Sequence, residues 1–185
     1  MRKYLFFDID GTLVGASHHV TDNNAKAIQQ ARANGHKAFL CSGRAPTSIM
    51  QDIIDVGFDG IICSAGGFIM IDGHFVFENL INQYVLQEVI TLFTNHHILF
   101  TLETRDTIYQ TPGVTEFFDQ RHQEHFKDNL ELKRFFELRR RGENREPIRR
   151  FNILKTPVAK ISFIARRKQD YEECVPFLED YFHIV

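Results

Sequence analysis

The chain has 185 residues, of which 43% are hydrophobic and 25% are charged, and its formal net charge is −2. This length suits one large domain or two small ones, and the charge gives no general attraction to nucleic acid or to anionic membranes. No stretch approaches about 18 consecutive apolar residues and the apolar run at the N-terminus ends in two acids, so we expect a cytoplasmic protein with no signal peptide and no transmembrane helix.

The first third of the chain alternates between short apolar runs and helical patterns. The predicted strands are 3–9, 37–41 and 60–64, and the predicted helices are 22–34 and 45–56. Thr21 and Gly35 supply the start and stop of the first helix, and Pro46 stands in the first turn of the second. The first strand is a continuous apolar run, typical of a strand covered on both faces. This order predicts an α/β domain with a parallel sheet and right-handed crossovers.

Hairpins replace this alternation from residue 66 onward. Two apolar runs flank Asp72-Gly73, the strongest hairpin signal in the chain, and a second predicted hairpin flanks Arg105-Asp106. Further predicted elements are a helix at 83–96, a charged, partly helical stretch at 115–150, a strand at 158–165 and a helix at 168–182 with a break near Pro176. We therefore expect an α+β unit with antiparallel strands, and we divide the chain into residues 1–81 and 82–185.

Polar residues follow each of the first three predicted strands. Asp8 and Asp10 end the first strand, Ser42-Gly43-Arg44 follow the second, and Ser64 with a run of small residues follows the third. Because ligands of doubly wound sheets bind at the carboxyl ends of the strands, we expect these groups to converge on one site.

These residue types suit phosphoryl transfer. A carboxylate such as Asp8 can attack phosphorus, and a divalent cation is needed to offset the repulsion between the two anions. Asp8 and the backbone around Asp10 offer hard oxygen ligands of the kind that Mg²⁺ takes. Gly11 lets the backbone approach a phosphate closely, and Thr12 and Ser42 can donate hydroxyl hydrogen bonds to it. Asp10 can protonate the leaving oxygen and later accept a proton from water.

Three segments carry a resemblance to a known family: "DIDGT" (8–12), "CSGR" (41–44) and "ICSAGG" (62–67). They resemble the haloacid dehalogenase superfamily of Mg²⁺-dependent phosphatases, and within it the Cof-type sugar-phosphate and nucleotide phosphatases. The resemblance implies a Rossmann-like parallel-sheet core with an inserted α+β cap, and Asp8 as nucleophile and metal ligand. It implies Asp10 as general acid and base and as a ligand through its carbonyl. The phosphate-binding residues that we predict are Gly11, Thr12, Ser42, Gly43 and Arg44.

The chain also departs from the family pattern. Such phosphatases use a lysine for charge neutralisation and a late "GDxxND"-like acidic motif, and this chain has no such motif and no lysine in the expected setting. Ala65-Gly66 stands where the family usually has Asn-Gly. The resemblance implies a longer relative whose chain returns from the cap to complete the core, whereas this chain ends at Val185. We therefore expect weak or no activity from this chain alone, and an exposed edge on the first strand.

Two alternative functions remain open beside Mg²⁺-dependent hydrolysis of a small phosphorylated metabolite. One is a non-catalytic, truncated homologue that retains only a phosphate- or Mg²⁺-binding pocket. The other is a phosphoacceptor resembling response regulators, which would not explain the long α+β insertion. The sequence predicts neither the substrate nor the oligomeric state.

Other polar clusters are better explained without a ligand. The basic run 133–150 is interleaved with glutamates, which favours an exposed cap helix over a nucleic-acid site. One of its arginines is a candidate contact for an anionic substrate. Histidines at 18–19, 96–97, 122 and 125 are expected on the surface rather than in a zinc site. Cys41, Cys63 and Cys174 form no CxxC pair and are expected to be reduced thiols.

Overall fold

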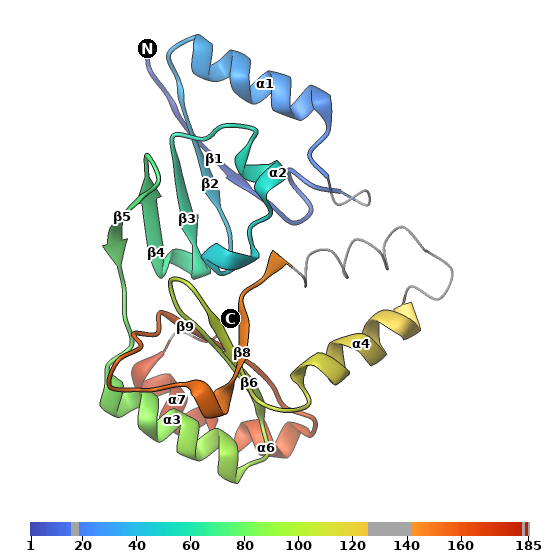
Figure 1. Ribbon diagram of the computed structural model, residues 1–185, viewed down its shortest axis with the longest axis vertical. Coiled ribbons are helices and arrows are strands. Elements are labelled where there is room, and N and C mark those ends of the chain that lie inside the picture. The colour runs from blue at the N-terminus through green and yellow to red at the C-terminus, as the bar shows by residue number, and fades with distance from the viewer. Residues whose placement is uncertain (16–18, 126–141, 183, 185) are drawn as a thin grey trace.

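The computed structural model describes residues 1–15, 19–125, 142–182 and 184, and its strands form two separate sheets (Figure 1). The first sheet has the strand order β1-β2-β3-β4-β5, and the second has the order β8-β7-β6-β9. We keep the predicted boundary near residue 81 and refer to residues 1–81 as the core unit and to residues 82–185 as the cap unit.

The sheet of the core unit combines a parallel half with an antiparallel hairpin. Its strands are β1 (Tyr4–Asp8), β2 (Lys37–Cys41), β3 (Gly60–Cys63), β4 (Phe68–Ile71) and β5 (His74–Glu78). β1 pairs in parallel with β2, and β2 with β3, as the sequence predicts. Asp72 and Gly73 connect β4 to β5 with φ angles of 50° and 77°, the left-handed conformation that a tight hairpin turn requires.

The prediction that the first strand is covered on both faces is wrong. β1 lies at the edge of the sheet, and Tyr4 and Phe6 are 61% and 60% exposed. The buried cluster of the core unit includes Ile28 of α1 (Asp22–Ala33) and Ile53 of α2 (Gln51–Ile54). Figure 1 shows both helices on the same side of the sheet, and no described element covers the other face of β1. A continuous apolar run therefore does not ensure burial on both faces.

The prediction of one continuous helix over residues 45–56 is also wrong. A 3₁₀ turn (Pro46–Ser48) and the short α2 are separated by extended backbone at Ile49 and Met50. Thr47, Ser48 and Ile49 all have low helix propensity. Ile49 is buried in the core, so that packing decides its conformation. The first helix, α1, has the predicted start, because the Thr21 hydroxyl accepts a hydrogen bond from the Asn24 amide.

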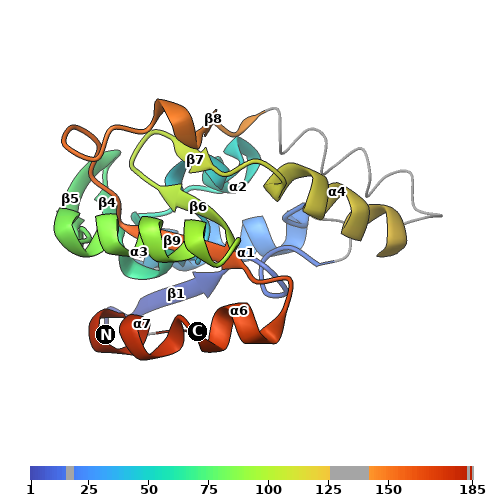
Figure 2. The ribbon, with the colours of Figure 1, turned by 90° about the horizontal axis from the view of Figure 1, so that it is seen from below.

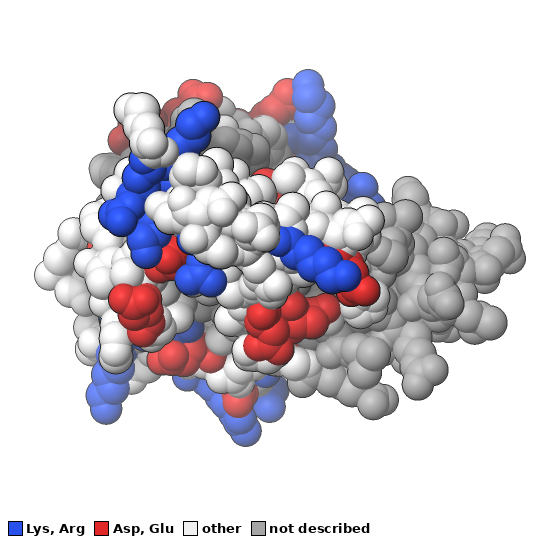
Figure 3. Space-filling model, turned by 90° about the horizontal axis from the view of Figure 1, so that it is seen from above, with Lys and Arg blue, Asp and Glu red and all other residues white. Residues whose placement is uncertain are grey.

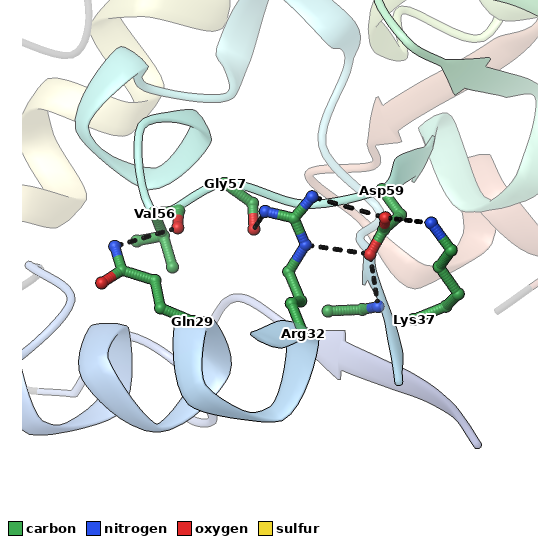
Figure 4. Close-up of polar contacts among 7 residues, drawn as sticks. Gln29, Arg32, Lys37, Val56, Gly57 and Asp59 are labelled. Carbon is green, nitrogen blue, oxygen red and sulfur yellow. Dashed lines mark hydrogen bonds and ion pairs between the residues drawn. The ribbon is translucent and has the colours of Figure 1, made fainter. Parts of the chain in front are cut away.

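An ion-pair network around Asp59 joins α1 to the sheet (Figure 4). Arg32 of α1 donates to both carboxylate oxygens of Asp59, at 2.9 and 3.3 Å. Lys37 and the Ala38 amide, both in β2, donate to the same carboxylate at 2.7 and 2.9 Å. The Arg32 hydrogen bonds hold the pKa of Asp59 well below its usual range. Asp59 therefore fixes the start of β2 against the end of α1.

The cap unit contains a four-stranded mixed sheet. Its strands are β6 (Leu99–Glu103), β7 (Ile108–Gln110), β8 (Arg145–Pro147) and β9 (Lys160–Ile164). The predicted hairpin around Arg105-Asp106 joins β6 to β7, and β9 pairs antiparallel with β6. β7 and β8 pair in parallel, so the expectation of antiparallel strands throughout is wrong there. The long connection that contains α4 (Val114–His125) makes a parallel return possible.

Helices cover the face of the cap sheet that points away from the core unit (Figures 1 and 2). They are α3 (Gln83–Asn95), α6 (Lys168–Glu172) and α7 (Val175–Tyr181), and a 3₁₀ turn (Ile148–Arg150) follows β8. α3 buries Leu86, Val89 and Phe93 on the predicted apolar face. The predicted break near Pro176 separates α6 from α7. Residues 126–141, in the predicted charged stretch, lie outside the described residues.

The described surface carries charges of both signs. On the face seen in Figure 3, acidic and basic side chains are interspersed. The three cysteines are free thiols, and Cys63 and Cys174 are buried. Among the described helices, none combines the length and the apolarity that crossing a bilayer requires.

Candidate active site

The turn after β1 presents two aspartates beside each other. Asp8 and Asp10 are exposed on either side of Ile9, which is completely buried. The Leu13 and Val14 amides donate to the Ile9 carbonyl at 3.1 and 3.0 Å, and both side chains are buried in the core. The apolar residues that follow the aspartates thus fold the chain back and hold the turn in place.

Gly11 and Thr12 form the tip of this turn. Gly11 has a φ of 83° and donates its amide to the Val14 carbonyl at 3.0 Å. Most side chains are strained in that conformation, which explains the glycine. Both residues are exposed. Their predicted contact with a phosphate stays a prediction.

The loop after β2 places Ser42 and Arg44 beside the aspartates. The Ser42 amide donates to the Ile62 carbonyl at 2.9 Å, which continues the pairing of β2 with β3. Its hydroxyl oxygen accepts a hydrogen bond from the Arg44 amide at 3.1 Å. Ser42 is 7% exposed. Its hydroxyl hydrogen is available as a donor, the role that the sequence predicts for it.

Arg44 binds Asp10 rather than lying free in the loop. Its Nε is 2.9 Å from Asp10 Oδ2 and its Nη2 is 2.5 Å from Oδ1. The Arg44 side chain is 5% exposed, whereas that of Asp10 is 59% exposed. The buried guanidinium therefore fixes the direction in which an accessible carboxylate points. Its Nε and Nη2 are directed at Asp10, whereas its buried Nη1 has no hydrogen-bond partner among the described residues. The predicted phosphate contact of Arg44 stays a prediction.

The predicted residues of two strand ends meet in one cavity of about 300 Å³ between the core unit and the cap unit. The core side of the cavity is lined by Asp8, Asp10, Ser42, Gly43, Arg44, Ala45 and Ser48. Its cap side includes Thr101, Glu103, Phe118, Arg145, Lys160 and Ser162. Gly11 and Thr12 are not among the lining residues. A larger hollow of about 990 Å³ lies against α3 and α7. It shares Lys160, Ser162 and Phe163 with this cavity, and no carboxylate lines it.

The cap side of the cavity contains charged residues. The sequence predicts no place in the site for Lys160 and Glu103, whereas Arg145 belongs to the basic run 133–150, which offers one arginine to an anionic substrate. Lys160 Nζ lies 3.1 Å from Glu103 Oε1 and donates to the Gly43 carbonyl of the core unit at 2.6 Å. Arg145 donates to Glu143 at 2.6 Å and to Gln110 at 3.0 Å. One signal for Glu103 exists in the sequence, because an acid ends the apolar run "LFTLE".

The thiols near the site are poor nucleophiles. Burial, and to a lesser extent the charge of Asp8, raises the pKa of the Cys41 thiol. Burial, followed by the charge of Glu103, raises the pKa of Cys63 to about 12. Because the thiolate is the reactive form, neither cysteine is an effective nucleophile at neutral pH.

The residues present allow a partial magnesium site. The carboxylate of Asp8 and the backbone carbonyl of Asp10 are hard oxygen donors of the type that Mg²⁺ prefers. Within the described residues, no three or more histidines, cysteines or acids cluster as metal ligands. Mg²⁺ commonly keeps several waters and takes only one or two carboxylates from the protein. These two donors therefore fit a weakly bound Mg²⁺ that keeps most of its water ligands.

Comparison with known proteins relates the whole chain to one family. Residues 5–185 match the family model of haloacid dehalogenase-like hydrolases. The phosphatase YwpJ of Bacillus subtilis (strain 168) is 24% identical over 119 residues, covering 63% of this chain and 42% of YwpJ. The chain thus spans less than half the length of that curated relative, and 46% of another from the same organism.

Solved structures share the fold at low sequence identity. A haloacid dehalogenase-like hydrolase from B. subtilis has a TM-score of 0.78 at 20% identity, with 95% of this chain and 66% of that chain covered. The subclass IIB sugar phosphatase BT4131 has a TM-score of 0.69 at 19% identity, with 96% of this chain and 64% of that chain covered. The predicted α/β fold, a partial parallel-sheet core with an inserted cap, is confirmed by these likenesses.

Proposed function

Because the chain belongs to the haloacid dehalogenase-like hydrolase family, we propose that it is a phosphatase that uses Asp8 as its nucleophile. The observation that carries the proposal is the single cavity shared by Asp8, Asp10, Ser42 and Arg44. A nucleophilic carboxylate, a second carboxylate two residues away and a hydroxyl donor are the parts that phosphoryl transfer through an aspartate needs.

The first step forms a phosphorylated aspartate. An oxygen of Asp8 attacks the phosphorus of the ester, and the bond between phosphorus and the ester oxygen breaks. The leaving oxygen takes the proton that Asp10 carries in this step, so that an alcohol departs. The Ser42 hydroxyl donates a hydrogen bond to a phosphoryl oxygen and keeps the group in line with Asp8.

The second step restores the aspartate. Asp10, now a carboxylate, accepts a proton from a water molecule as the water attacks phosphorus. The bond between phosphorus and Asp8 breaks, inorganic phosphate leaves, and Asp10 again carries the proton. Arg44 keeps the carboxyl group of Asp10 aimed at the cavity, because its two hydrogen bonds restrict the rotation of that side chain.

Mg²⁺, when bound, would neutralise charge between the phosphate and the nucleophile. The Asp8 carboxylate and the Asp10 carbonyl would hold it, as the family resemblance implies. Because the described residues include no cluster of three or more histidines, cysteines or acids, these two donors support only weak binding. We therefore expect a requirement for millimolar Mg²⁺ rather than a tightly retained ion.

The substrate that we propose is a small phosphorylated metabolite, a sugar phosphate or a nucleotide. A cavity of about 300 Å³ suits a molecule of that size. Its cap side offers Ser162 and Thr101 hydroxyls and the paired charges of Lys160 and Glu103, which can hydrogen-bond a polar leaving group. The exposed ring of Phe118 adds an apolar surface at the same wall.

A screen of phosphate esters tests the proposal. The 185-residue chain is incubated with sugar phosphates and nucleotides in the presence of Mg²⁺, and released phosphate is measured. Release that requires Mg²⁺ and disappears in Asp8→Asn supports the proposal. Release that Asp8→Asn leaves unchanged contradicts it. Asp55→Asn, an exposed aspartate of the core unit outside the cavity, is the matched control.

A binding protein without turnover is the second candidate. It is favoured by the missing third metal ligand among the described residues, because two oxygen donors support phosphate binding more readily than fast chemistry. Saturable binding of inorganic phosphate without hydrolysis of any ester in the screen would establish this alternative. Asp8→Asn would then retain or increase phosphate affinity, because it removes a negative charge from the pocket.

A further inference from the structure

We propose that Lys160 of the cap unit is a positioning residue for the phosphate-binding loop of the core unit, and that Glu103 holds Lys160 in place. The two residues would couple docking of the cap to the geometry of Ser42 and Arg44. This inference deepens the proposed function and rests on it only for the consequence in phosphate binding. The contacts that carry it are independent of any reaction.

Lys160 reaches from one unit to the other. Its Nζ donates to the Gly43 carbonyl at 2.6 Å, across a sequence separation of 117 residues. A lysine that served only solubility would extend into solvent, but this side chain is 27% exposed and lines the cavity with Asp8 and Asp10. A hydrogen bond from a charged donor is stronger than one between neutral groups, so the contact orients the carbonyl that accepts it.

The carbonyl that Lys160 binds belongs to a peptide unit that is held at both ends. Gly43 supplies the C=O of this unit and Arg44 supplies its N–H. The N–H donates to the Ser42 hydroxyl oxygen at 3.1 Å, while the C=O accepts from Lys160. Peptide units are planar, so fixing both ends fixes the plane between Ser42 and Arg44. The orientation of that plane determines the position of the Ser42 hydroxyl and the position of the Arg44 Cα, from which the Arg44 side chain extends.

Glu103 holds Lys160 at this position. The two residues face each other on neighbouring strands β6 and β9, and Lys160 Nζ lies 3.1 Å from Glu103 Oε1. The Glu103 side chain is 8% exposed, and a buried carboxylate needs partners. Ser162 donates to its Oε1 and Ser64 of the core unit donates to its Oε2, each at 3.0 Å. One buried carboxylate therefore contacts both units.

The backbone of the core unit is shaped to accept this contact. Ser64 is buried and has a φ of 48°, a left-handed conformation that non-glycine residues rarely adopt. Its amide donates to the Arg44 carbonyl at 2.7 Å. The loop after β3 is thus hydrogen-bonded both to Glu103 of the cap unit and to the loop after β2, whose Arg44 binds Asp10. Removing Lys160 would leave the Gly43 carbonyl without its charged partner on the cap side.

Amide hydrogen exchange at Arg44 tests the proposal directly. NMR on the full chain compares Lys160→Met with Lys168→Met, a matched change at a lysine that is 86% exposed on α6. We expect exchange of the Arg44 amide to become about tenfold faster in Lys160→Met, because one charged hydrogen bond is lost, and to be unchanged in Lys168→Met. Equal exchange in both variants would overturn the proposal.

Two further variants separate positioning from a general loss of structure. Lys160→Arg keeps a cationic donor and should restore most of the protection of the Arg44 amide. Glu103→Gln keeps the fold of β6 but removes the charge that holds Lys160, and should give an intermediate rate. If Lys160→Met does not fold, these two variants still test the proposal. Protection of the Arg44 amide equal to that in the wild type would, in Glu103→Gln, overturn it.

Binding of inorganic phosphate in the presence of Mg²⁺ supplies the second readout. We expect about a tenfold weaker affinity in Lys160→Met and no change in Lys168→Met. If the wild-type chain binds no phosphate, the proposed function fails, whereas the Arg44 exchange rates still test the positioning role. If phosphate affinity falls while Arg44 exchange stays constant, Lys160 contacts the ligand itself and the positioning role is contradicted.

Discussion

Arg44 donates two hydrogen bonds to the carboxylate of Asp10, from Nε to Oδ2 at 2.9 Å and from Nη2 to Oδ1 at 2.5 Å. A guanidinium that binds both oxygens of a carboxylate fixes its orientation as well as its position. The pair joins the loop after β2 to the turn after β1. We therefore infer that Arg44 acts on the chemistry through Asp10, a role that the sequence does not predict beside its predicted phosphate contact.

Arg44→Lys tests that inference. Lysine keeps the positive charge but cannot bind both oxygens in a fixed plane, so Asp10 should be poorly aimed. We expect kcat to fall by about 10- to 100-fold with a much smaller change in KM. Steady-state kinetics measure both, and Arg166→Lys, at an exposed arginine of the cap unit, is the control. A large rise in KM at constant kcat would instead assign Arg44 to phosphate binding.

Asp59→Asn should destabilise the core unit. The Asp59 side chain is 12% exposed and accepts from Arg32, Lys37 and the Ala38 amide. Loss of its charge should lower the free energy of unfolding by about 2–4 kcal/mol at pH 7. Urea denaturation measures the change, and Asp55→Asn, at an exposed position near α2, should have little effect. Equal stability of both variants would contradict the role of the network.

The same network predicts a dependence on pH. The pKa of Asp59 is lowered on folding, mainly by the Arg32 hydrogen bonds, from an ordinary value of 3.8. The carboxylate therefore stabilises the fold fully above that value, and the contribution is lost as the pH falls below it through the folded-state pKa. The stability difference between wild type and Asp59→Asn should be constant from pH 7 to about 5 and should shrink below about 4. A stability difference between the two proteins that grows as the pH falls would have the opposite pH dependence and would refute this account.

Gly67→Ala should disturb the contact between the two units. A Cβ at Gly67 would lie 2.9 Å from the Cβ of Ala159 in the cap unit and 3.1 Å from the Ser64 carbonyl. We expect a loss of about 1–3 kcal/mol in unfolding free energy, because neither neighbour is the flexible end of a long side chain. Gly15→Ala, where a Cβ meets nothing within 4 Å, is the matched control. Thermal denaturation of the two variants side by side gives the comparison.

Cys63 should resist alkylation in the folded protein. Burial, with the charge of Glu103 as the smaller cause, raises its pKa to about 12, so almost no thiolate forms at pH 8. Iodoacetamide labelling followed by mass spectrometry should modify Cys63 only after denaturation. Rapid labelling of Cys63 in the native chain at pH 8 would contradict this prediction, because it would show that solvent and reagent reach the Cys63 thiol.

The sequence was sufficient to predict the features whose structure depends on local residue spacing. The turn from Asp8 to Val14 follows from two acids around one buried isoleucine and from a glycine with positive φ. The convergence of Ser42 on Asp10 follows from parallel strands, whose carboxyl ends share one edge. The hairpin at Asp72-Gly73 follows from turn chemistry. Each of these depends on residues close in sequence or on one topological rule.

The sequence was insufficient where packing of distant segments decides. Lys160 and Gly43 meet only because the cap docks on the core, and no spacing rule connects residues 117 positions apart. The helix predicted from Ala45 to Val56 is interrupted because Ile49 packs into the core in an extended conformation. The edge position of β1 agrees with the sequence, but the exposure of one of its faces depends on which elements pack there, and an apolar run does not encode that.

The measurement that tests the central claim most directly is detection of a phosphoryl group on Asp8. The chain is mixed with a hydrolysable phosphate ester and Mg²⁺, quenched with acid within the first turnover and digested for mass spectrometry. We predict a phosphorylated aspartate in the peptide that contains Asp8, and its absence in Asp8→Asn. Hydrolysis that continues in Asp8→Asn, or a phosphoryl group on a different residue, would contradict the claim that Asp8 is the nucleophile.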